Sequence, residues 1–151
     1  MEDWKSVEEV LDFAIGNEEK AAKFYTDMAA KMDKAWMKAV FEGFAREEQG
    51  HKKKLEAVKS GKLAQSAEKK ILDLKIGDYL TNAEVSADME YQDALILAMK
   101  AEKAAFKLYN DLADSVDDDN LKNTFLGLAQ EEAKHKLRFE LEYDENVLTE
   151  N

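Results

Sequence analysis

An internal repeat most constrains how this 151-residue chain can fold. Two Glu-x-x-His segments lie 84 positions apart (132 − 48 = 84), and they contain both histidines of the chain. A further glutamate and a tyrosine recur at the same offset. The repeated pairs are Glu18 and Glu102, Tyr25 and Tyr109, Glu48 and Glu132, and His51 and His135. The simplest explanation is two similar helical hairpins, each of which contributes half of one site.

Apolar residues recur at alternating steps of three and four along four segments, which predicts four amphipathic helices. The repeated glutamates, histidines and tyrosines fall on the apolar faces, so we expect their side chains to point into a core. The four stripes are Val7, Leu11, Ala14, Glu18, Ala21, Tyr25, Met28 and Met32; Met37, Phe41, Phe44, Glu48, His51, Leu55 and Val58; Tyr91, Leu95, Ala98, Glu102, Ala105, Tyr109, Leu112 and Val116; and Leu121, Phe125, Leu128, Glu132, His135 and Phe139.

These stripes predict an all-α protein. The segment Ser6-Val7-Glu8-Glu9 is typical of a capping box that begins a helix. We expect helices over about residues 6–32, 34–59, 89–116 and 120–142. The chain has no proline and only six glycines, which favours long uninterrupted helices.

About 30 residues, 60–88, separate the second and third predicted helices, too many for a hairpin loop. That length suits a crossover along the full height of a bundle, so the third helix would begin at the end where the second began. We expect a short helix near residues 67–74 and a turn at Gly77-Asp78. Its apolar residues should hold the crossover on the bundle: Ile71, Leu74, Ile76, Tyr79 and Leu80.

The predicted fold is a four-helix bundle of two repeated hairpins, about residues 6–59 and 89–142, forming one domain over residues 1–151. In each repeat the two glutamates lie 15 residues before and after the expected turn residue, Asp33 or Asp117. At 1.5 Å per residue, each glutamate is roughly 22 Å from its turn. All four can therefore meet in one layer if the hairpins pack side by side.

Four carboxylates and two imidazoles in one layer are donors that suit iron or manganese. Structural zinc would call for sulfur or a four-ligand N/S set, and the chain has no cysteine. A buried ionised carboxylate is disfavoured by several kcal/mol unless it is paired or coordinated. The alternative to a metal site is a buried polar layer bridged by water. The six candidate metal ligands are Glu18, Glu48, His51, Glu102, Glu132 and His135.

We expect Glu48 and Glu132 to bridge two metal ions. In each half, the other glutamate and the histidine would be terminal ligands, although the pairing across helices could be exchanged. Tyr25 and Tyr109 lie two turns beyond the terminal glutamates on the same faces. There a phenol can hydrogen-bond a ligating carboxylate of the other half, and core packing is compatible with that role. No catalytic residue is expected beyond the ligands.

With these motifs the chain resembles the rubrerythrin and ferritin-like di-iron carboxylate proteins, in particular the short rubrerythrin-like group. The resemblance covers about residues 7–58 and 90–140. It implies a ferritin-like bundle that holds two iron ions (Fe2+/Fe3+), with manganese or a mixed pair as alternatives, and that reacts with peroxide or dioxygen. The residues that carry it are Glu18 in Asn17-Glu18-Glu19-Lys20-Ala21-Ala22-Lys23-Phe24-Tyr25, Glu48-x-x-His51, Glu102 with Tyr109, and Glu132-x-x-His135.

Oxidases, peroxidases, ferroxidases and storage proteins share these motifs, so the resemblance leaves several functions open. The chain could be a di-iron oxidoreductase in oxidative-stress defence or iron handling, an iron-binding or storage protein, or a bundle that keeps metal for stability alone. Rubrerythrin itself adds a four-cysteine rubredoxin-like iron site and a further glutamate on the third helix. This chain has no cysteine. The residues one turn before and after Glu102 are Met99 and Ala105, and neither is a carboxylate. A peroxidase of this kind would need an external electron donor such as a rubredoxin.

The net charge of the chain indicates which classes of partner are unfavourable. With 33 acidic and 22 basic residues, the net charge of −11 argues against nucleic acids and anionic membranes. No apolar stretch approaches the roughly 18 residues of a membrane span, and no hydrophobic run follows Met1-Glu2-Asp3-Trp4. We therefore expect a cytoplasmic protein, and a homodimer.

Overall fold

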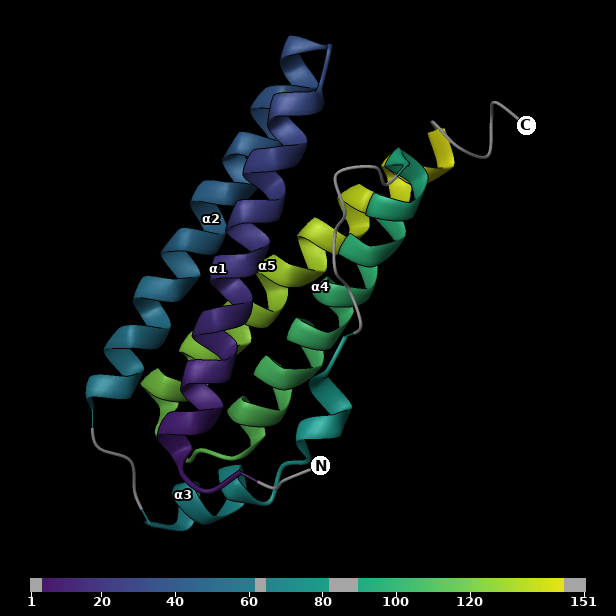
Figure 1. The fold of residues 1–151 in the computed structure, drawn as a ribbon. Coiled ribbons are helices and arrows are strands. Elements are labelled where there is room, and N and C mark those ends of the chain that lie inside the picture. Colours follow the sequence, from purple (N-terminus) through teal and green to yellow (C-terminus); the bar gives the residue numbers. More distant parts are fainter. Residues whose placement is uncertain (1–3, 62–64, 82–89, 146–151) are drawn as a thin grey trace. The chain divides into compact units, whose positions relative to one another are not determined.

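The computed structural model describes residues 4–61, 65–81 and 90–145 (Figure 1). Helices are the only regular secondary structure in these residues, which contain no strand, and this confirms the all-α class. The described residues divide into two compact units, those up to Leu72 and those from Asp73 onward, each built around one helical hairpin. Their union in a single domain stays a prediction. The elements are α1 (Val7–Lys31), α2 (Ala35–Ser60), α3 (Gln65–Leu72), the 3-10 helix η1 (Ile76–Tyr79), α4 (Tyr91–Asp114) and α5 (Asp119–Tyr143).

In the first unit, α1 and α2 pack along their lengths as an antiparallel pair (Figure 1). The predicted capping box is half confirmed, because the Ser6 hydroxyl accepts the Glu9 N–H at 3.2 Å. The Glu9 carboxylate accepts the N–H of Lys5 at 2.8 Å instead of that of Ser6. The short helix α3 packs on α1 and buries Ile71. The hairpin core is built from the predicted stripe, including Leu11, Ala14, Tyr25, Met28, Met37, Phe41 and Leu55.

In the second unit, α4 and α5 form the other antiparallel pair. The Asp118 carboxylate begins α5 by accepting the N–H of Leu121 at 2.8 Å. Helix α4 ends at Asp114, two residues before the predicted end, and the Ser115 hydroxyl donates to the Asp111 carbonyl at 2.7 Å. The predicted start at residue 89 lies outside the described residues. The core again follows the stripes, including Leu95, Ala98, Leu112, Phe125, Leu128 and Phe139.

The crossover is only partly described, because residues 62–64 and 82–89 lie outside the described part. Its short helix begins and ends two residues before the predicted bounds, and the predicted turn at Gly77-Asp78 is part of η1. Tyr79 is buried, and its hydroxyl donates to the Asp111 carboxylate at 2.7 Å, which ties η1 to α4. The expectation that Leu80 packs on the bundle is wrong, because its side chain is 42% exposed. Leu80 is the first residue after η1 and has extended backbone, so its side chain leaves the helical face on which Tyr79 is buried.

The other expectations about the crossover concern two of its apolar residues and its path, and a last one concerns membrane-spanning helices. Leu74 is half-buried, and the side chain of Ile76 lies outside the described residues. That the crossover runs the height of the bundle stays a prediction. None of the described helices combines the length and the apolar character that crossing a membrane requires.

Candidate metal centre

The first hairpin brings two carboxylates and an imidazole together in its core. Glu48 and His51 share a face of α2 because residues three apart on a helix are neighbours, and Glu18 reaches them from α1. The three side chains are 1–2% exposed. His51 Nδ1 lies 3.5 Å from Glu18 Oε2 and 3.5 Å from Glu48 Oε1. Each residue offers a ligand atom within 4.8 Å of the others.

The second hairpin repeats this triad. Glu132 and His135 share a face of α5, and Glu102 reaches them from α4. All three side chains are buried, and His135 Nδ1 lies 3.8 Å from Glu102 Oε1. Their ligand atoms also lie within 4.8 Å of one another. Each hairpin thus builds by itself one of the two predicted half-sites.

Each triad places its two carboxylates and its imidazole in a core where the side chains are 1–2% exposed. Two carboxylates carry two negative charges when ionised, and a protonated histidine would offset only one of them. Burying an uncompensated charge is costly, so such groups are usually paired or coordinated. A cation is the partner that the charge balance of each triad favours.

The donor geometry fits an ion of the size of iron or manganese. Ligand atoms on an octahedral ion with bonds of about 2.1 Å lie roughly 3 Å apart when adjacent and roughly 4 Å apart when opposite. The imidazole–carboxylate separations of 3.5 to 3.8 Å fall within that span. The donors are oxygen and nitrogen, and the sequence has no cysteine to supply sulfur. Small movements of these side chains would close the triads around an ion.

The two repeated tyrosines lie in the hairpin cores, as expected. Tyr25 and Tyr109 are each buried. Tyr25 meets Phe44 edge to face, with ring centroids 5.7 Å apart. Their role as hydrogen-bond donors to ligating carboxylates stays a prediction.

Sequence reasoning missed a fifth buried carboxylate, which lies in the second hairpin on the same helix as Glu132. Glu142 is buried on α5, and its Oε1 accepts a hydrogen bond from the Tyr91 hydroxyl at 3.0 Å. Burial, and then the adjacent carboxylate, raises the pKa of Tyr91. The sequence did indicate that Glu142 is buried, because it lies three residues after Phe139 and so continues the apolar stripe of the last helix.

The first hairpin also carries an ion pair beside its triad that the stripes did not predict. Lys52 Nζ lies 2.8 Å from Glu19 Oε1, which joins α2 to α1 at the surface. The hydrogen bond to Glu19 raises the pKa of Lys52. Both residues directly follow a candidate ligand in the sequence, so they flank the triad on its solvent side.

Comparison with known proteins shows the family. The rubrerythrin family model matches residues 9–143, a range that includes all six candidate ligands. This chain belongs to the rubrerythrin family. No curated protein matches the chain significantly.

Two solved structures resemble this rubrerythrin-family chain over most of its length, and the first of them shows that the fold is ferritin-like. One is described as a candidate ferritin-like diiron-carboxylate protein of Thermotoga maritima. It is 19% identical with a TM-score of 0.78, over 97% of this chain and 99% of that one. The other is a hypothetical protein of Pyrococcus furiosus, 26% identical with a TM-score of 0.69, over 93% of this chain and 89% of that one. The predicted family and ferritin-like fold are confirmed.

Proposed function

We propose that this member of the rubrerythrin family is a di-iron carboxylate oxidoreductase that reacts with peroxide or dioxygen. The observation that carries the proposal is the buried Glu-Glu-His triad in each hairpin. The triads repeat at one sequence offset, as expected of two halves of one site in a ferritin-like bundle. Four carboxylates would balance the charge of two divalent cations.

In this proposal the six candidate ligands coordinate two metal ions. Glu48 and Glu132 would bridge them, and the remaining glutamate and histidine of each hairpin would be terminal ligands. Bound iron would supply the electrons that reduce the oxidant, through its change between Fe2+ and Fe3+. Manganese or a mixed pair fits the same donors.

The surrounding residues of the chain would keep the ligands in place. The Nδ1 atoms of His51 and His135 point toward the carboxylates, so the same atoms are the natural donors to an ion. Tyr25 and Tyr109 would hold ligating carboxylates by hydrogen bonds from their hydroxyls. Because the ligand side chains are 1–2% exposed, water would compete little for the open coordination positions.

A second function, iron oxidation or storage without peroxidase turnover, is favoured by the lack of cysteine. Without cysteine the chain cannot carry a rubredoxin-like electron-transfer iron of its own. A peroxidase would therefore depend on a separate donor, whereas a ferroxidase would take its electrons from the iron substrate.

Rapid mixing separates these functions. The anaerobic protein is loaded with Fe2+ and mixed with peroxide or with dioxygen while the absorbance of the oxidised site is followed. We expect peroxide to react faster, and steady turnover only when a donor such as a rubredoxin is added. Rapid repeated oxidation of Fe2+ in a large mineral-filled particle would assign the protein to storage instead. No reaction with either oxidant would leave only a stabilising metal.

The setting of this activity is also part of the proposal. We propose a cytoplasmic homodimer that acts on small oxidants, without nucleic acid or membrane partners. Cell fractionation tests the location, and light scattering of the purified protein tests the dimer.

A further inference from the structure

A polar cavity of about 280 Å³ opens between α1 and α2 of the first hairpin. The candidate ligand Glu18, 2% exposed, is the most buried residue of its lining. Other lining side chains reach the solvent, since Glu19 is 54% and Lys52 36% exposed. The cavity therefore connects the surface of this hairpin with one member of its triad.

The lining of this cavity has the chemistry that a divalent cation needs on its way inward. A hydrated cation does not cross an apolar core, because each lost water must be replaced by another oxygen. Glu19, Thr26, Asp27 and Gln49 belong to the lining, and their side chains carry oxygens that can replace the lost waters. Counting Glu18, three acidic residues and two lysines belong to the lining, so acidic residues outnumber basic ones there.

The ammonium groups in the cavity are held by the same acids. Lys52 Nζ lies 2.8 Å from Glu19 Oε1, and Lys23 Nζ lies 3.3 Å from Asp27 Oδ2. These pairs are at the surface, where an ion pair contributes little stability. An arriving divalent cation can therefore displace a lysine at small cost.

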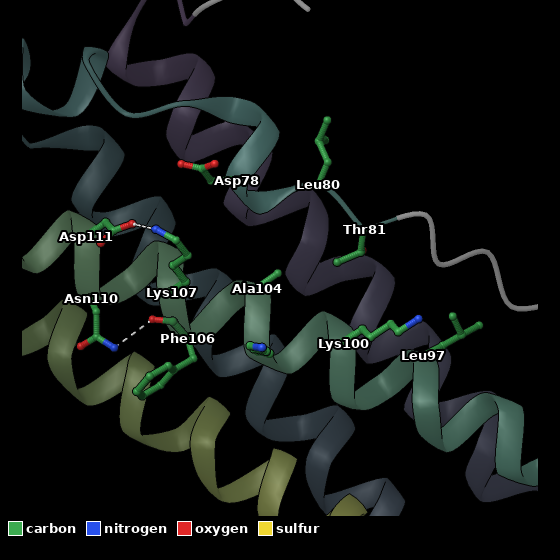
Figure 2. A pocket seen from close by; sticks show the side chains of 11 residues that line it. Asp78, Leu80, Thr81, Leu97, Lys100, Ala104, Phe106, Lys107, Asn110 and Asp111 are labelled. Carbon is green, nitrogen blue, oxygen red and sulfur yellow. Dashed lines mark hydrogen bonds and ion pairs between the residues drawn. The ribbon is translucent and has the colours of Figure 1, made fainter.

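The residues that line this cavity are only partly repeated in the second hairpin, although the triad repeats. At the offset of 84, Lys103 replaces Glu19, Phe106 replaces Ala22 and Ala133 replaces Gln49. Figure 2 shows the cavity of about 720 Å³ that lies instead between η1 and α4, with apolar Leu80, Leu97 and Phe106 near the lysines of α4. None of the six candidate ligands belongs to its lining. Its lining contains three lysines, two aspartates and apolar side chains, so it favours a cation less than the polar cavity of the first hairpin does.

We propose that the polar cavity of the first hairpin is the port through which divalent cations enter the metal centre. Glu19 and Asp27 are the first oxygen ligands, Glu18 receives the ion, and the small side chain of Ala22 keeps the passage open. The inference rests on the proposed metal centre and adds its route of loading.

The test uses two variants that give the first hairpin the residues of the second. The apo-protein is mixed with Co2+ in a stopped-flow instrument, and binding is followed by the visible absorption of the bound ion. Glu19→Lys should slow uptake about tenfold at low ionic strength, with a smaller effect in high salt. Ala22→Phe should slow it at least as much by filling the passage, without the same dependence on salt. The amount of Co2+ bound at equilibrium should match the wild type in both.

Glu42→Lys is the matched control, because Glu42 is exposed on α2 and is absent from the cavity lining, and its charge change is the same. It should load at the wild-type rate. Wild-type rates in both cavity variants, or equal slowing by Glu42→Lys and Glu19→Lys, would overturn the port. If Ala22→Phe does not fold, Glu19→Lys decides alone, since Glu19 is exposed. A wild-type protein that binds no Co2+ would overturn the metal centre itself, and the port with it.

Discussion

Replacing Glu48 by glutamine should stabilise the apo-protein while it removes most of the stabilisation by metal. Ligand oxygens of Glu18 and Glu48 lie within 4.8 Å of each other and are almost fully buried. At an effective dielectric constant of about 20, two like charges at that distance repel by about 3 kcal/mol. Glutamine keeps the shape and loses the charge. Allowing for hydrogen bonds that the carboxylate accepts, we expect apo Glu48→Gln to be about 1–3 kcal/mol more stable.

Urea unfolding followed by circular dichroism measures this difference, once in chelator and once with Fe2+ or Mn2+ under anaerobic conditions. The wild type should gain stability with the metal by mass action, and Glu48→Gln should gain far less. Glu42→Gln is the control, because it makes the same chemical change at an exposed position of the same helix and should shift neither value by more than about 0.5 kcal/mol. An apo Glu48→Gln protein less stable than the wild type, with an unchanged gain from metal, would refute the reasoning.

Three other changes test the structure around the site. Ser6→Ala removes the side-chain cap of α1 and should cost about 1 kcal/mol in urea unfolding. Tyr91→Phe removes the hydrogen bond to buried Glu142 and should cost about 1–3 kcal/mol by the same assay. Burial, and then the hydrogen bond to Asp111, raises the pKa of Tyr79 in the folded protein. Tyr79 therefore contributes fully to the free energy of unfolding below the tyrosine pKa of the unfolded chain, about 10. That contribution is lost as the pH rises above this value. Unfolding of Tyr79→Phe should therefore depend less on pH between about 9 and 11 than unfolding of the wild type.

The helices and the two triads were predictable because they depend on spacing within one helix or one hairpin. Glu48 and His51 share a face whatever the rest of the chain does, since residues three apart on a helix are neighbours. The apolar stripe likewise predicted buried positions such as Phe41 and Phe125. Local periodicity determines which side of a helix faces its partner.

The crossover was predicted less well because its contacts are not periodic. Tyr79 rather than Leu80 is buried, since a hydrogen bond to Asp111, 32 residues away, determines how η1 lies on α4. A pairing between distant polar groups leaves no signal in local spacing. The polar cavity beside Glu18 was missed for a related reason, because its lining combines exposed positions of two helices that each look like ordinary solvated surface.

Metal content per chain tests the central claim most directly, namely that the two triads form one centre for two ions. Wild-type protein and the Glu48→Ala variant are loaded with Fe2+ without oxygen, freed of excess metal and analysed for bound iron. A bridging Glu48 predicts about two ions per wild-type chain and almost none in the variant, although the triad of the second hairpin is intact in both. About one ion per wild-type chain, or a variant that keeps one or two, would contradict a shared centre.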